Sequence, residues 1–356
     1  MSKNFRLGEL FCGPGGIALG ASMSKFEDGN DVYQITPTWA SDYDKETCET
    51  FARNIHGHSL SEASNSVFHG DVRELDILGL PKCDGLAFGF PCNDFSIVGE
   101  SKGLEGTFGP LYSYGVKYLR KHQPDWFIAE NVGGLRSSNG GEAFELIIND
   151  LRHSGYSLTT NLYKFEDYGV PQARHRLIIV GIRNDLNLTF KVPAPTHKDN
   201  YVTSFDAISF PPITSENHNH DFTNQSKGVV ERLKHIKPGD NAWSEDIPQH
   251  LRLNVKGARL SNIYKRLDPA KPSYTVTGSG GGGTHMYHWE EHRALTNRER
   301  ARLQTFPDNF VFCGGKESVR RQIGMAVPPI GANVIFEAIL KTFAKQSYDF
   351  VDSSKP

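Results

Sequence analysis

The stretch that decides the fold is Gly85-Leu-Ala-Phe-Gly-Phe-Pro-Cys-Asn-Asp-Phe-Ser96. An apolar run ends there in a Gly-Phe-Pro break and is followed by a polar loop, which predicts a buried strand that opens into a loop at its carboxyl end. Ligands bind at that edge of an open α/β sheet. The thiol of Cys92 should therefore face the crevice. It is either a nucleophile, since thiolate is the reactive form, or a buried structural cysteine, and this stretch leaves both open.

Length and composition limit the class of protein. The 356 residues are 38% hydrophobic and 22% charged, which is enough for a sizeable core and favours two domains. We find no apolar run of the length of a membrane span and no secretory leader, so we expect a cytoplasmic protein with no membrane partner. The five cysteines form no CxxC pair, which argues against a disulfide framework and against a zinc–thiolate site.

Charge is unevenly distributed along the chain. A net charge of −2 argues at first against a nucleic-acid partner. Residues 251–302, however, contain ten basic and four acidic side chains. They form either an ordinary solvated surface or a stripe that faces phosphates, and the charge alone slightly favours the former. The basic residues are Arg252, Lys256, Arg259, Lys265, Arg266, Lys271, Arg293, Arg298, Arg300 and Arg302.

The N-terminal part of the chain predicts a nucleoside pocket. Residues 6–21 predict a strand, the glycine-rich turn Cys12-Gly-Pro-Gly-Gly16 and a helix, and glycines let backbone amides approach a ligand closely. The spacing is not GxGxxG, which disfavours a nicotinamide oxidoreductase. Asp42 and Asp71 end the next two predicted strands, where they would hold a ribose and an exocyclic amine, and Tyr43 could pack on a flat ring. Either acid alone could be a helix N-cap, but three strand ends in this order are hard to explain by capping.

Two further motifs follow at predicted strand ends. The apolar strand Trp126–Ala129 delivers Glu130 to the same edge, where partial desolvation should raise its pKa to a value suited to protonating a base. A buried salt bridge is the alternative. Arg174 and Arg176 precede the strand Leu177–Val180 at a spacing of two and should share one face, where they would hold an anion or a carbonyl oxygen or be ordinary surface arginines.

The other segments surround this predicted edge. Residues 93–109 are rich in glycine, which indicates either a mobile lid or a flexible connection. Residues 192–246 are rich in Pro, Asn, His and Ser and predict an irregular second domain. Strand-like segments at 274–277 and 285–289 flank the glycine run 278–283, which is either a linker or a loop that presses its backbone against a partner. Helices are predicted over 111–119, 144–151, 295–304, with a threonine N-cap, and 330–343, the last of which should pack back on the first domain.

Two groups of histidines invite a metal interpretation that the sequence does not support. The segment His218-Asn-His220 lacks the spaced arrangement of a nuclease metal site. His285, His288 and His292 have no carboxylate or thiolate in register with them. We therefore predict no metal site and favour surface or DNA-facing histidines.

These motifs in this order resemble those of the DNA (cytosine-5) methyltransferases of bacterial type II restriction–modification systems, over nearly the whole chain. Two positions depart from the family pattern: Asn93 stands where glutamine is usual, and Met325 stands where an asparagine usually contacts the cofactor. The matching segments are Phe11-Cys-Gly-Pro-Gly-Gly16, Asp42-Tyr43, Asp71, Gly89-Phe-Pro-Cys92, Glu130-Asn-Val132, Gln172-x-Arg174-x-Arg176 and Arg298-Glu-x-Ala-Arg-Leu-Gln-x-Phe-Pro-Asp308.

The resemblance implies an α/β fold, with a Rossmann-like, S-adenosylmethionine-dependent methyltransferase sheet and a second, smaller, irregular and β-rich target-recognition domain. The implied domains are residues 1–192 plus 321–356 for catalysis and cofactor binding, 193–292 for target recognition and 293–320 as a hinge. Contacts to S-adenosylmethionine are expected from Phe11, Gly13, Gly15, Gly16, Asp42, Tyr43, Asp71, Val72, Pro91 and Leu111. Contacts to double-stranded DNA are expected from Ser96, Lys102, Arg252, Lys256, Arg259, Gly280, Gly281 and Gly282, with recognition loops at 251–264 and 276–288.

The implied reaction is methyl transfer to C5 of a cytosine flipped out of the duplex. Cys92 would add to C6, Glu130 would protonate N3, Arg176 would hold O2, and Arg174 would steady Glu130 or the backbone. We expect a monomer in the bacterial cytoplasm, paired in function with a restriction endonuclease. The alternatives are an RNA cytosine-5 methyltransferase of the same fold and a non-catalytic, methyltransferase-like DNA-binding protein.

Overall fold

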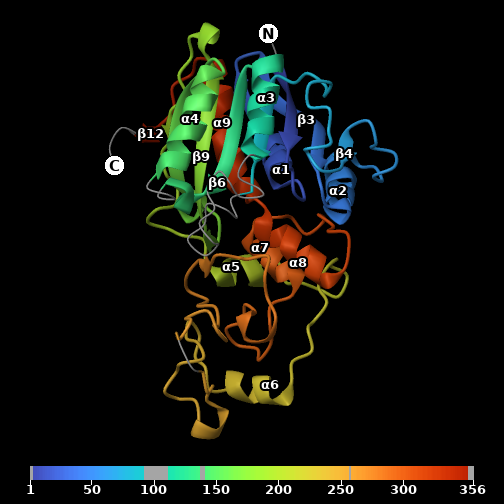
Figure 1. Ribbon diagram of the computed structural model, residues 1–356. Helices are drawn as coiled ribbons and strands as arrows, with labels where there is room; N and C mark the ends of the chain where they lie inside the picture. The colour runs from blue at the N-terminus through green and yellow to red at the C-terminus, as the bar shows by residue number, and fades with distance from the viewer. Residues whose placement is uncertain (1–2, 92–110, 137–140, 256–257, 352–356) are drawn as a thin grey trace. The chain divides into compact units, whose positions relative to one another are not determined.

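The computed structural model describes residues 3–91, 111–136, 141–255 and 258–351. The chain divides into two compact units, and Figure 1 labels many of their helices and strands. Unit 1 comprises Met1–Lys164, His175–Pro195 and Pro329–Pro356, and unit 2 comprises Phe165–Arg174 and Thr196–Pro328. The target-recognition and hinge roles assigned above to residues 193–320 stay predictions.

Unit 1 is built on one eight-stranded sheet of order β2-β3-β1-β5-β6-β9-β7, with β4 beside β3. The central pairs β3–β1, β1–β5 and β5–β6 are parallel, whereas β2–β3, β6–β9 and β9–β7 are antiparallel. The strands are β1 (Lys3–Leu10), β2 (Lys25–Asp28), β3 (Asp31–Asp42), β4 (Val67–His69), β5 (Gly85–Gly89), β6 (Trp126–Val132), β7 (Tyr156–Lys164) and β9 (His175–Arg183). A separate antiparallel pair joins β10 (Val192–Pro193) to β12 (Phe350–Val351).

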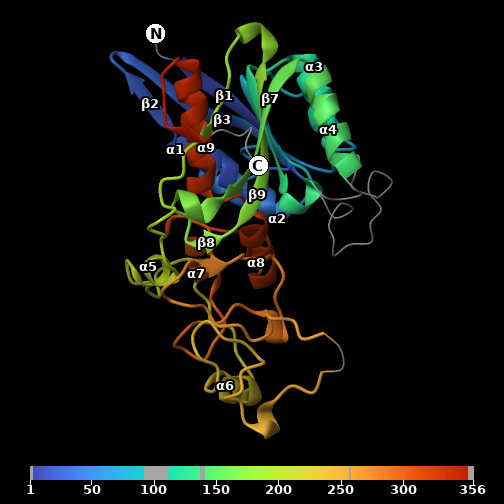
Figure 2. The same cartoon turned by 90° about the vertical axis from the view of Figure 1, so that its left-hand side faces the viewer.

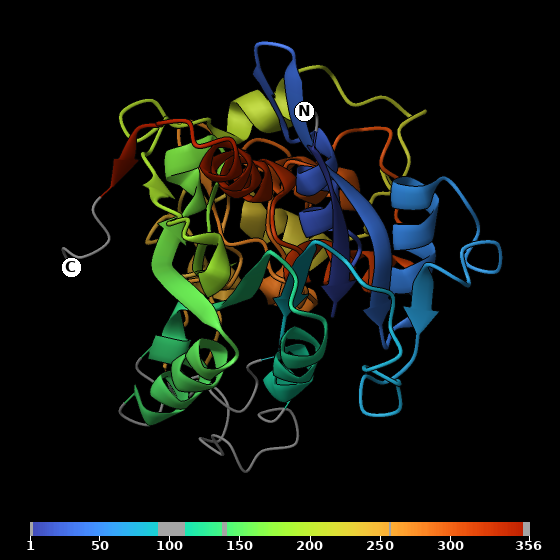
Figure 3. The same ribbon diagram turned by 90° about the horizontal axis from the view of Figure 1, so that it is seen from above.

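Helices cover both faces of this sheet. Figure 2 and Figure 3 show α1 (Gly16–Met23) and α9 (Pro329–Phe343) on one face, and α3 (Tyr112–His122) and α4 (Glu142–His153) on the other. The helices predicted over 111–119, 144–151 and 330–343 are thereby confirmed. The last of these helices, α9, packs back on the sheet domain as predicted. Its contact with α1 is so close that a Cβ on Gly20 would lie 2.5 Å from the carbonyl oxygen of Pro329. Helix α2 (Lys45–Phe51) continues into a π-helical turn, Ala52–His56.

The central strands are buried on both sides, as parallel strands covered by two helical layers must be. In β5 the residues from Gly85 to Phe88 are all buried. Aromatic rings need room between such closely spaced layers. Gly85 provides it, since a Cβ there would lie 2.1 Å from the indole of Trp126 on the neighbouring strand. Gly8 in β1 accommodates Trp39 in the same way, at 2.3 Å.

One helical run among the described residues, Lys316–Phe343, is long and apolar enough by composition to cross a membrane. Of its apolar window, 72% is buried inside the protein, as in the core helix of a soluble protein.

Unit 2 is irregular and contains few strands. Its regular strands among the described residues are β8 (Gln172–Ala173) and β11 (Ser273–Tyr274), which pair in parallel. The segment 285–289, predicted to be strand-like, forms isolated bridges at Tyr287 alone. The irregular character is as expected, and the β content is lower than the β-rich domain that the resemblance implied. Helices here are α5 (Ser204–Ser209), α6 (Lys227–Leu233), α7 (Asn297–Leu303) and α8 (Lys316–Met325).

The predicted threonine N-cap of the helix at 295–304 is confirmed in α7. The hydroxyl of Thr296 accepts the backbone N–H of Glu299, and the carboxylate of Glu299 accepts the backbone N–H of Thr296. This reciprocal pair is a capping box, which satisfies two donors that the first turn of a helix leaves unpaired. Short 3₁₀ turns occur at Gly133–Arg136, Phe165–Tyr168, Asn184–Leu186, Gln249–Leu251 and Gly282–Thr284.

Candidate active site

The carboxyl ends of the parallel strands meet at one edge of the unit 1 sheet. The backbone register joins the last residues of β1 to those of β3 and β5, and those of β5 to β6. The glycine-rich turn at 11–16, Asp42, Phe90 and Glu130 are therefore brought to the same edge, as predicted for these strand ends. This is the position where open α/β sheets bind their ligands.

The turn between β1 and α1 is shaped by left-handed backbone. Phe11, Gly13 and Gly15 have φ angles of 56°, 55° and 101°. A Cβ on Gly15 would lie 3.1 Å from Phe51 and 3.0 Å from Ile55, which pack beneath the turn. Around Gly13, by contrast, no described atom lies within 4 Å of such a Cβ. Bare backbone therefore faces outward at Gly13, where a ligand could approach closely.

Asp42 anchors this turn. Its Oδ2 accepts the backbone N–H of Gly13 and its Oδ1 that of Asp44, both at 3.0 Å. Burial raises the pKa of the Asp42 carboxyl, against the effect of these donors. The side chain is not a helix N-cap, since Asp44 caps α2 by accepting the N–H of Thr47. Each oxygen of Asp42 keeps a second lone pair that a ribose hydroxyl could use.

Glu9 lies at the same strand ends and was not singled out from the sequence. It is 1% exposed, and neither carboxylate oxygen has a hydrogen-bond partner within the described residues. Burial, followed by the charge of Asp42, raises the pKa of Glu9 well above its ordinary value. The backbone of Ala18 in α1 acts in the other direction and lowers the pKa of Glu9, but it does not outweigh the burial. The sequence does contain a signal for Glu9, since an acidic residue at the end of an otherwise apolar strand is unusual and indicates a special role.

Asp71 follows β4 and is held by a residue that sequence reasoning missed. Nε of Arg73 lies 2.9 and 3.0 Å from the two carboxylate oxygens, and its Nη2 donates to Oδ2. Hydrogen bonding from Arg73 lowers the pKa of Asp71 to about 2. An exocyclic amine at Asp71 would therefore share an ionised carboxylate with this guanidinium.

Apolar residues expected near the cofactor gather in one cluster. Val72 and Leu111 are buried in the core together with Phe90, and Phe11 packs against them. Tyr43 differs, being 65% exposed. Pro91, half-buried, is the last described residue before the catalytic motif's cysteine.

Glu130 and Arg176 form an ion pair at the sheet edge. Nε of Arg176 lies 3.0 Å from Oε1 of Glu130, and the side chains are 15% and 14% exposed. Arg176 reaches the pair from β9, where it lies opposite Val132 of β6. A Cβ on Gly89 of β5 would lie 3.2 Å from Oε2 of Glu130, so that glycine leaves room for the carboxylate. The salt bridge considered as an alternative for Glu130 is thus present within the predicted site.

Arg174 and Arg176 take separate positions, although their spacing predicted one shared face. Arg174 precedes β9, which begins at His175, so the alternation of side chains along a strand does not apply to it. It is buried in unit 2 and donates through Nη1 to the carbonyl of Val276 at 3.1 Å and through Nη2 to that of Gly324 at 3.0 Å. These contacts tie Arg174 to the backbone of Val276 and Gly324, and its expected role of steadying Glu130 or the backbone during the reaction stays a prediction.

The residues expected to contact DNA lie in unit 2 where the structure describes them. Arg252 donates to the carbonyls of Ile247 and Glu245, at 2.8 and 3.1 Å. The guanidinium of Arg259 lies 5.4 Å from the ring centroid of Trp243. Gly280 is half-buried, whereas Gly281 and Gly282 are exposed. Their contacts to DNA stay predictions.

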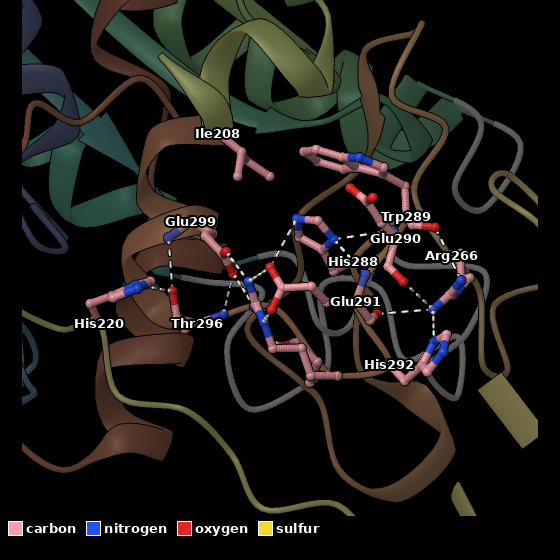
Figure 4. A network of polar contacts seen from close by, with 12 residues as sticks. Ile208, His220, Arg266, His288, Trp289, Glu290, Glu291, His292, Thr296 and Glu299 are labelled. Atoms are coloured by element: carbon pink, nitrogen blue, oxygen red, sulfur yellow. Dashed lines mark hydrogen bonds and ion pairs between the residues drawn. The ribbon is translucent and has the colours of Figure 1, made fainter. Parts of the chain in front are cut away.

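Some basic side chains of residues 251–302 lie inside unit 2 and not on its surface. Figure 4 shows Arg266 among the residues that bond it: its guanidinium donates to the carbonyls of Trp289, Glu290 and Glu291 at 2.9–3.3 Å. Of the nine basic side chains of this stripe that the structure describes, four are buried, namely Arg266, Arg298, Arg300 and Arg302.

His288 and His292 form hydrogen bonds with residues close by in unit 2. Nδ1 of His288 accepts the backbone N–H groups of Glu290 and Glu291, each at 3.1 Å (Figure 4). Nδ1 of His292 lies 2.7 Å from a guanidinium nitrogen of Arg266. Within the part of the chain that the structure describes, no group of three or more His, Cys, Asp or Glu side chains could hold a metal ion.

Several predicted residues lie outside the described residues. They are Cys92, Ser96, Lys102 and Lys256, together with Asn93 and the predicted lid at 93–109. Met325, the other departure from the family pattern, is 49% exposed at the end of α8.

Comparison with known sequences identifies one family. Residues 5–341 match the C-5 cytosine-specific DNA methylases. The chain is 59% identical to the type II methyltransferase M.BbvI of Brevibacillus brevis, over 98% of this chain and 94% of that protein. It is 39% identical to the type II methyltransferase M.NgoFVII of Neisseria gonorrhoeae, over 96% and 88%. It is 28% identical to the DNA (cytosine-5-)-methyltransferase M.ApeKI of Aeropyrum pernix, over 93% and 97%.

Solved structures confirm the predicted α/β fold. A prophage-encoded DNA modification methyltransferase of E. coli matches with a TM-score of 0.71 and 24% identity, over 95% of this chain and 99% of that one. The Entamoeba histolytica methyltransferase EhMeth matches with a TM-score of 0.61 and 15% identity, over 97% and 100%. The chain therefore belongs to the C-5 cytosine-specific DNA methylase family and is a cytosine-5 DNA methyltransferase of the type II restriction–modification type.

Proposed function

We propose that this enzyme uses S-adenosylmethionine to methylate C5 of a cytosine flipped out of duplex DNA, through a covalent adduct of Cys92. We further propose that it acts as a monomer in the bacterial cytoplasm and protects host DNA from a cognate restriction endonuclease. The observation that carries the proposal is the ion pair of Glu130 and Arg176. Glu130 lies on β6, which pairs with β5. The chain leaves β5 through Phe90 and Pro91 and then reaches Cys92.

The residues at the strand ends of unit 1 fit the methyl donor. Its sulfonium and ammonium groups are cations, and the unpartnered carboxyl of Glu9 is a buried group that such cations would favour in ionised form. Asp42 keeps lone pairs for the ribose hydroxyls, and Asp71 would share its carboxylate between Arg73 and the adenine amine. When bound, the cofactor supplies an electrophilic methyl group.

The chain's own groups make the cytosine reactive, because C5 is too weak a nucleophile to take a methyl group directly. The thiolate of Cys92 adds to C6, and the carboxyl of Glu130 gives its proton to N3, which leaves an enamine-like carbon at C5. After C5 has bonded to the methyl group, a base removes the C5 proton, the C6–S bond breaks to release the thiolate, and the N3 proton returns to Glu130. Arg176 would hold the cytosine O2 and Glu130 together, fixing the acid against the base.

Base flipping is required by this geometry of reaction. C6 and N3 of a stacked, paired cytosine are inaccessible to side chains on both sides of the ring. Extrusion costs a few kcal/mol, which contacts to the flipped base and to the DNA backbone must offset. Closure of residues 93–109 over the base is part of the proposal.

A trapping experiment tests the proposal. The protein is incubated with tritiated S-adenosylmethionine and duplex DNA that carries 5-fluorocytosine, because fluorine at C5 cannot be removed as a proton. We expect a labelled protein–DNA band on a denaturing gel, absent in Cys92→Ala. Glu130→Gln should slow its formation by about 10²- to 10⁴-fold, as loss of a general acid does, while the exposed Glu145→Gln in α4 leaves it unchanged. A band with fluorinated RNA and none with DNA would indicate an RNA substrate. No band with either nucleic acid would contradict the covalent mechanism.

A further inference from the structure

Arg300 is a buried cation with unused donors. It is 1% exposed in α7, and neither its Nη1 nor its Nη2 has a hydrogen-bond partner within the described residues. The other two arginines of the same helix are fully engaged. Arg298 donates to three backbone carbonyls, and Arg302 donates to the carboxylate of Asp308 and to two carbonyls. Because an unpaired buried guanidinium is strongly unfavourable, Arg300 requires a partner from outside the described chain.

The groups around Arg300 do not neutralise it. Burial, followed by the charge of Arg320 in α8, lowers the pKa of Arg300 to about 10, so it remains charged at neutral pH. The carboxylate of Glu299 is already bonded through both oxygens to Arg293, at 2.7 and 2.8 Å, within the network of Figure 4. His285, whose Nδ1 lies 3.4 Å from Nη1 of Arg320, has its pKa lowered to about 4 by burial and by the two arginines, so it carries no charge.

Arg320 also lacks a strong counter-charge. Its ion-pair partner in α8 is Glu317, at 3.8 Å, and that side chain is 90% exposed. An ion pair at this distance with so exposed a carboxylate contributes little. Arg300 and Arg320 thus form a local excess of positive charge on two neighbouring helices of unit 2.

Glycine backbone lies against this cluster. A Cβ on Gly280 would lie 3.3 Å from Cδ of Arg320 and 3.5 Å from Nδ1 of His285. The next two residues, Gly281 and Gly282, are exposed, and no described atom lies within 4 Å of a Cβ built on either. Backbone at these two glycines can shift at little cost and lets a ligand come close.

We propose that Arg300 and Arg320 bind a tetrahedral oxyanion beneath the glycine run 278–283, and that in the complex with substrate this oxyanion is a phosphate of the DNA backbone. Two guanidiniums without a strong carboxylate partner are the donor set that suits phosphate, since each can bind it through parallel N–H groups. Burial strengthens the attraction because the surroundings screen it less than water does. The second half of the proposal rests on the proposed function of the enzyme, whereas the oxyanion site does not.

The first measurement addresses the oxyanion site in the free protein. Thermal unfolding of the full chain is followed in sodium phosphate and in sodium chloride of equal ionic strength. Phosphate should raise the Tm of the wild type in a saturable way, and Arg300→Met should abolish that response while keeping a Tm in chloride at or above that of the wild type, since it removes an unpaired buried charge. Arg300→Lys should restore part of the response. The exposed Arg152→Met in α4 is the matched control and should respond like the wild type.

The second measurement identifies the source of the oxyanion. Affinity for duplex DNA is measured over a range of salt concentrations, and Arg300→Met should weaken binding about tenfold and reduce the salt slope by about one.

A phosphate response with an unchanged DNA slope would assign the site to a free anion and overturn the DNA half of the proposal. No phosphate response and no slope change would overturn the site itself; Arg320→Met gives the same two readouts if Arg300→Met does not fold. Failure of the wild type in the trapping experiment would contradict the proposed function without affecting the phosphate result.

Discussion

The carboxylate of Glu130 contacts residues of two neighbouring strands, and each strand places a particular residue type beside it. Arg176 of β9 fixes Oε1 at 3.0 Å, while the bare Cα of Gly89 in β5 leaves room for Oε2. Lysine at position 176 would keep the charge but lose the planar guanidinium. Alanine at position 89, on the strand that leads to Cys92, would crowd the carboxylate of Glu130. The acid and the nucleophile of the proposed mechanism therefore depend on adjacent strands of one rigid sheet.

The buried acid Glu9 should make the stability of the protein depend on pH. Its folded-state pKa is raised by burial, so the folded protein retains a proton that the unfolded chain releases above about pH 4. Stability from this group is therefore fully present below the unfolded pKa and declines as the pH rises toward the folded value. We expect Glu9→Gln to remove this decline and to raise the free energy of unfolding at pH 8 by about 1 to 3 kcal/mol. Denaturant unfolding at pH 5 and pH 8 measures it.

The substitution that stabilises the fold should at the same time weaken cofactor binding. Glu9→Gln is expected to weaken binding of S-adenosylmethionine, measured by calorimetry, because an amide cannot become an anion near a bound cation. The exposed Glu145→Gln of α4 should change neither quantity. Equal pH dependence in the wild type and in Glu9→Gln would show that Glu9 does not hold its proton in the folded state.

Helix α8 packs against Thr277 and against Gly278, the first residue of the glycine run, with no space to spare. A Cβ on Gly324 would lie 1.9 Å from the backbone nitrogen of Gly278 and 2.2 Å from the carbonyl carbon of Thr277. Backbone cannot move aside as a side chain can. Gly324→Ala should therefore lower the free energy of unfolding by at least about 2 kcal/mol, read as a fall in Tm. Gly228 of α6 has no described atom within 4 Å of its Cβ position, so Gly228→Ala should leave the Tm unchanged or raise it. Similar Tm values for the two variants would refute this account of the packing.

The sequence predicts the elements whose signals are local and misses those that depend on tertiary contacts. The apolar run at 86–88 and the Thr296 cap are local, and both are confirmed. The strand expected at 285–289 is not formed as such, because His288 bonds the backbone N–H groups of the two following glutamates and turns the chain. Likewise, Asp42 and Asp71 could be placed at strand ends, but the hold of Arg73 on Asp71 is a side-chain contact that no pattern in the sequence indicates.

The count of basic residues in the chain overstates the surface charge available for DNA. A cation inside unit 2 stabilises the fold through carbonyls and carboxylates, as Arg298 and Arg302 do, and is screened from the solvent by protein. Spacing along the chain does not distinguish such arginines from exposed ones, which is why composition could not settle the partner. The net charge of −2 is equally uninformative, since phosphates respond to the local field and not to the total.

Burial of these arginines should limit the salt dependence of DNA binding by the enzyme. Each phosphate contact contributes about −0.9 to the slope of log affinity against log salt, so ten contacts from residues 251–302 would give about −9. Arg266, Arg298 and Arg302 are buried and bonded to oxygens of the protein itself. At most seven contacts therefore remain, that of Arg300 included, and we expect a slope of about −3 to −6. Fluorescence anisotropy of a labelled duplex between 50 and 200 mM potassium chloride measures the slope. A value near −9 would mean that the buried arginines become exposed when DNA binds, and a value near zero would contradict a phosphate-facing role for this segment.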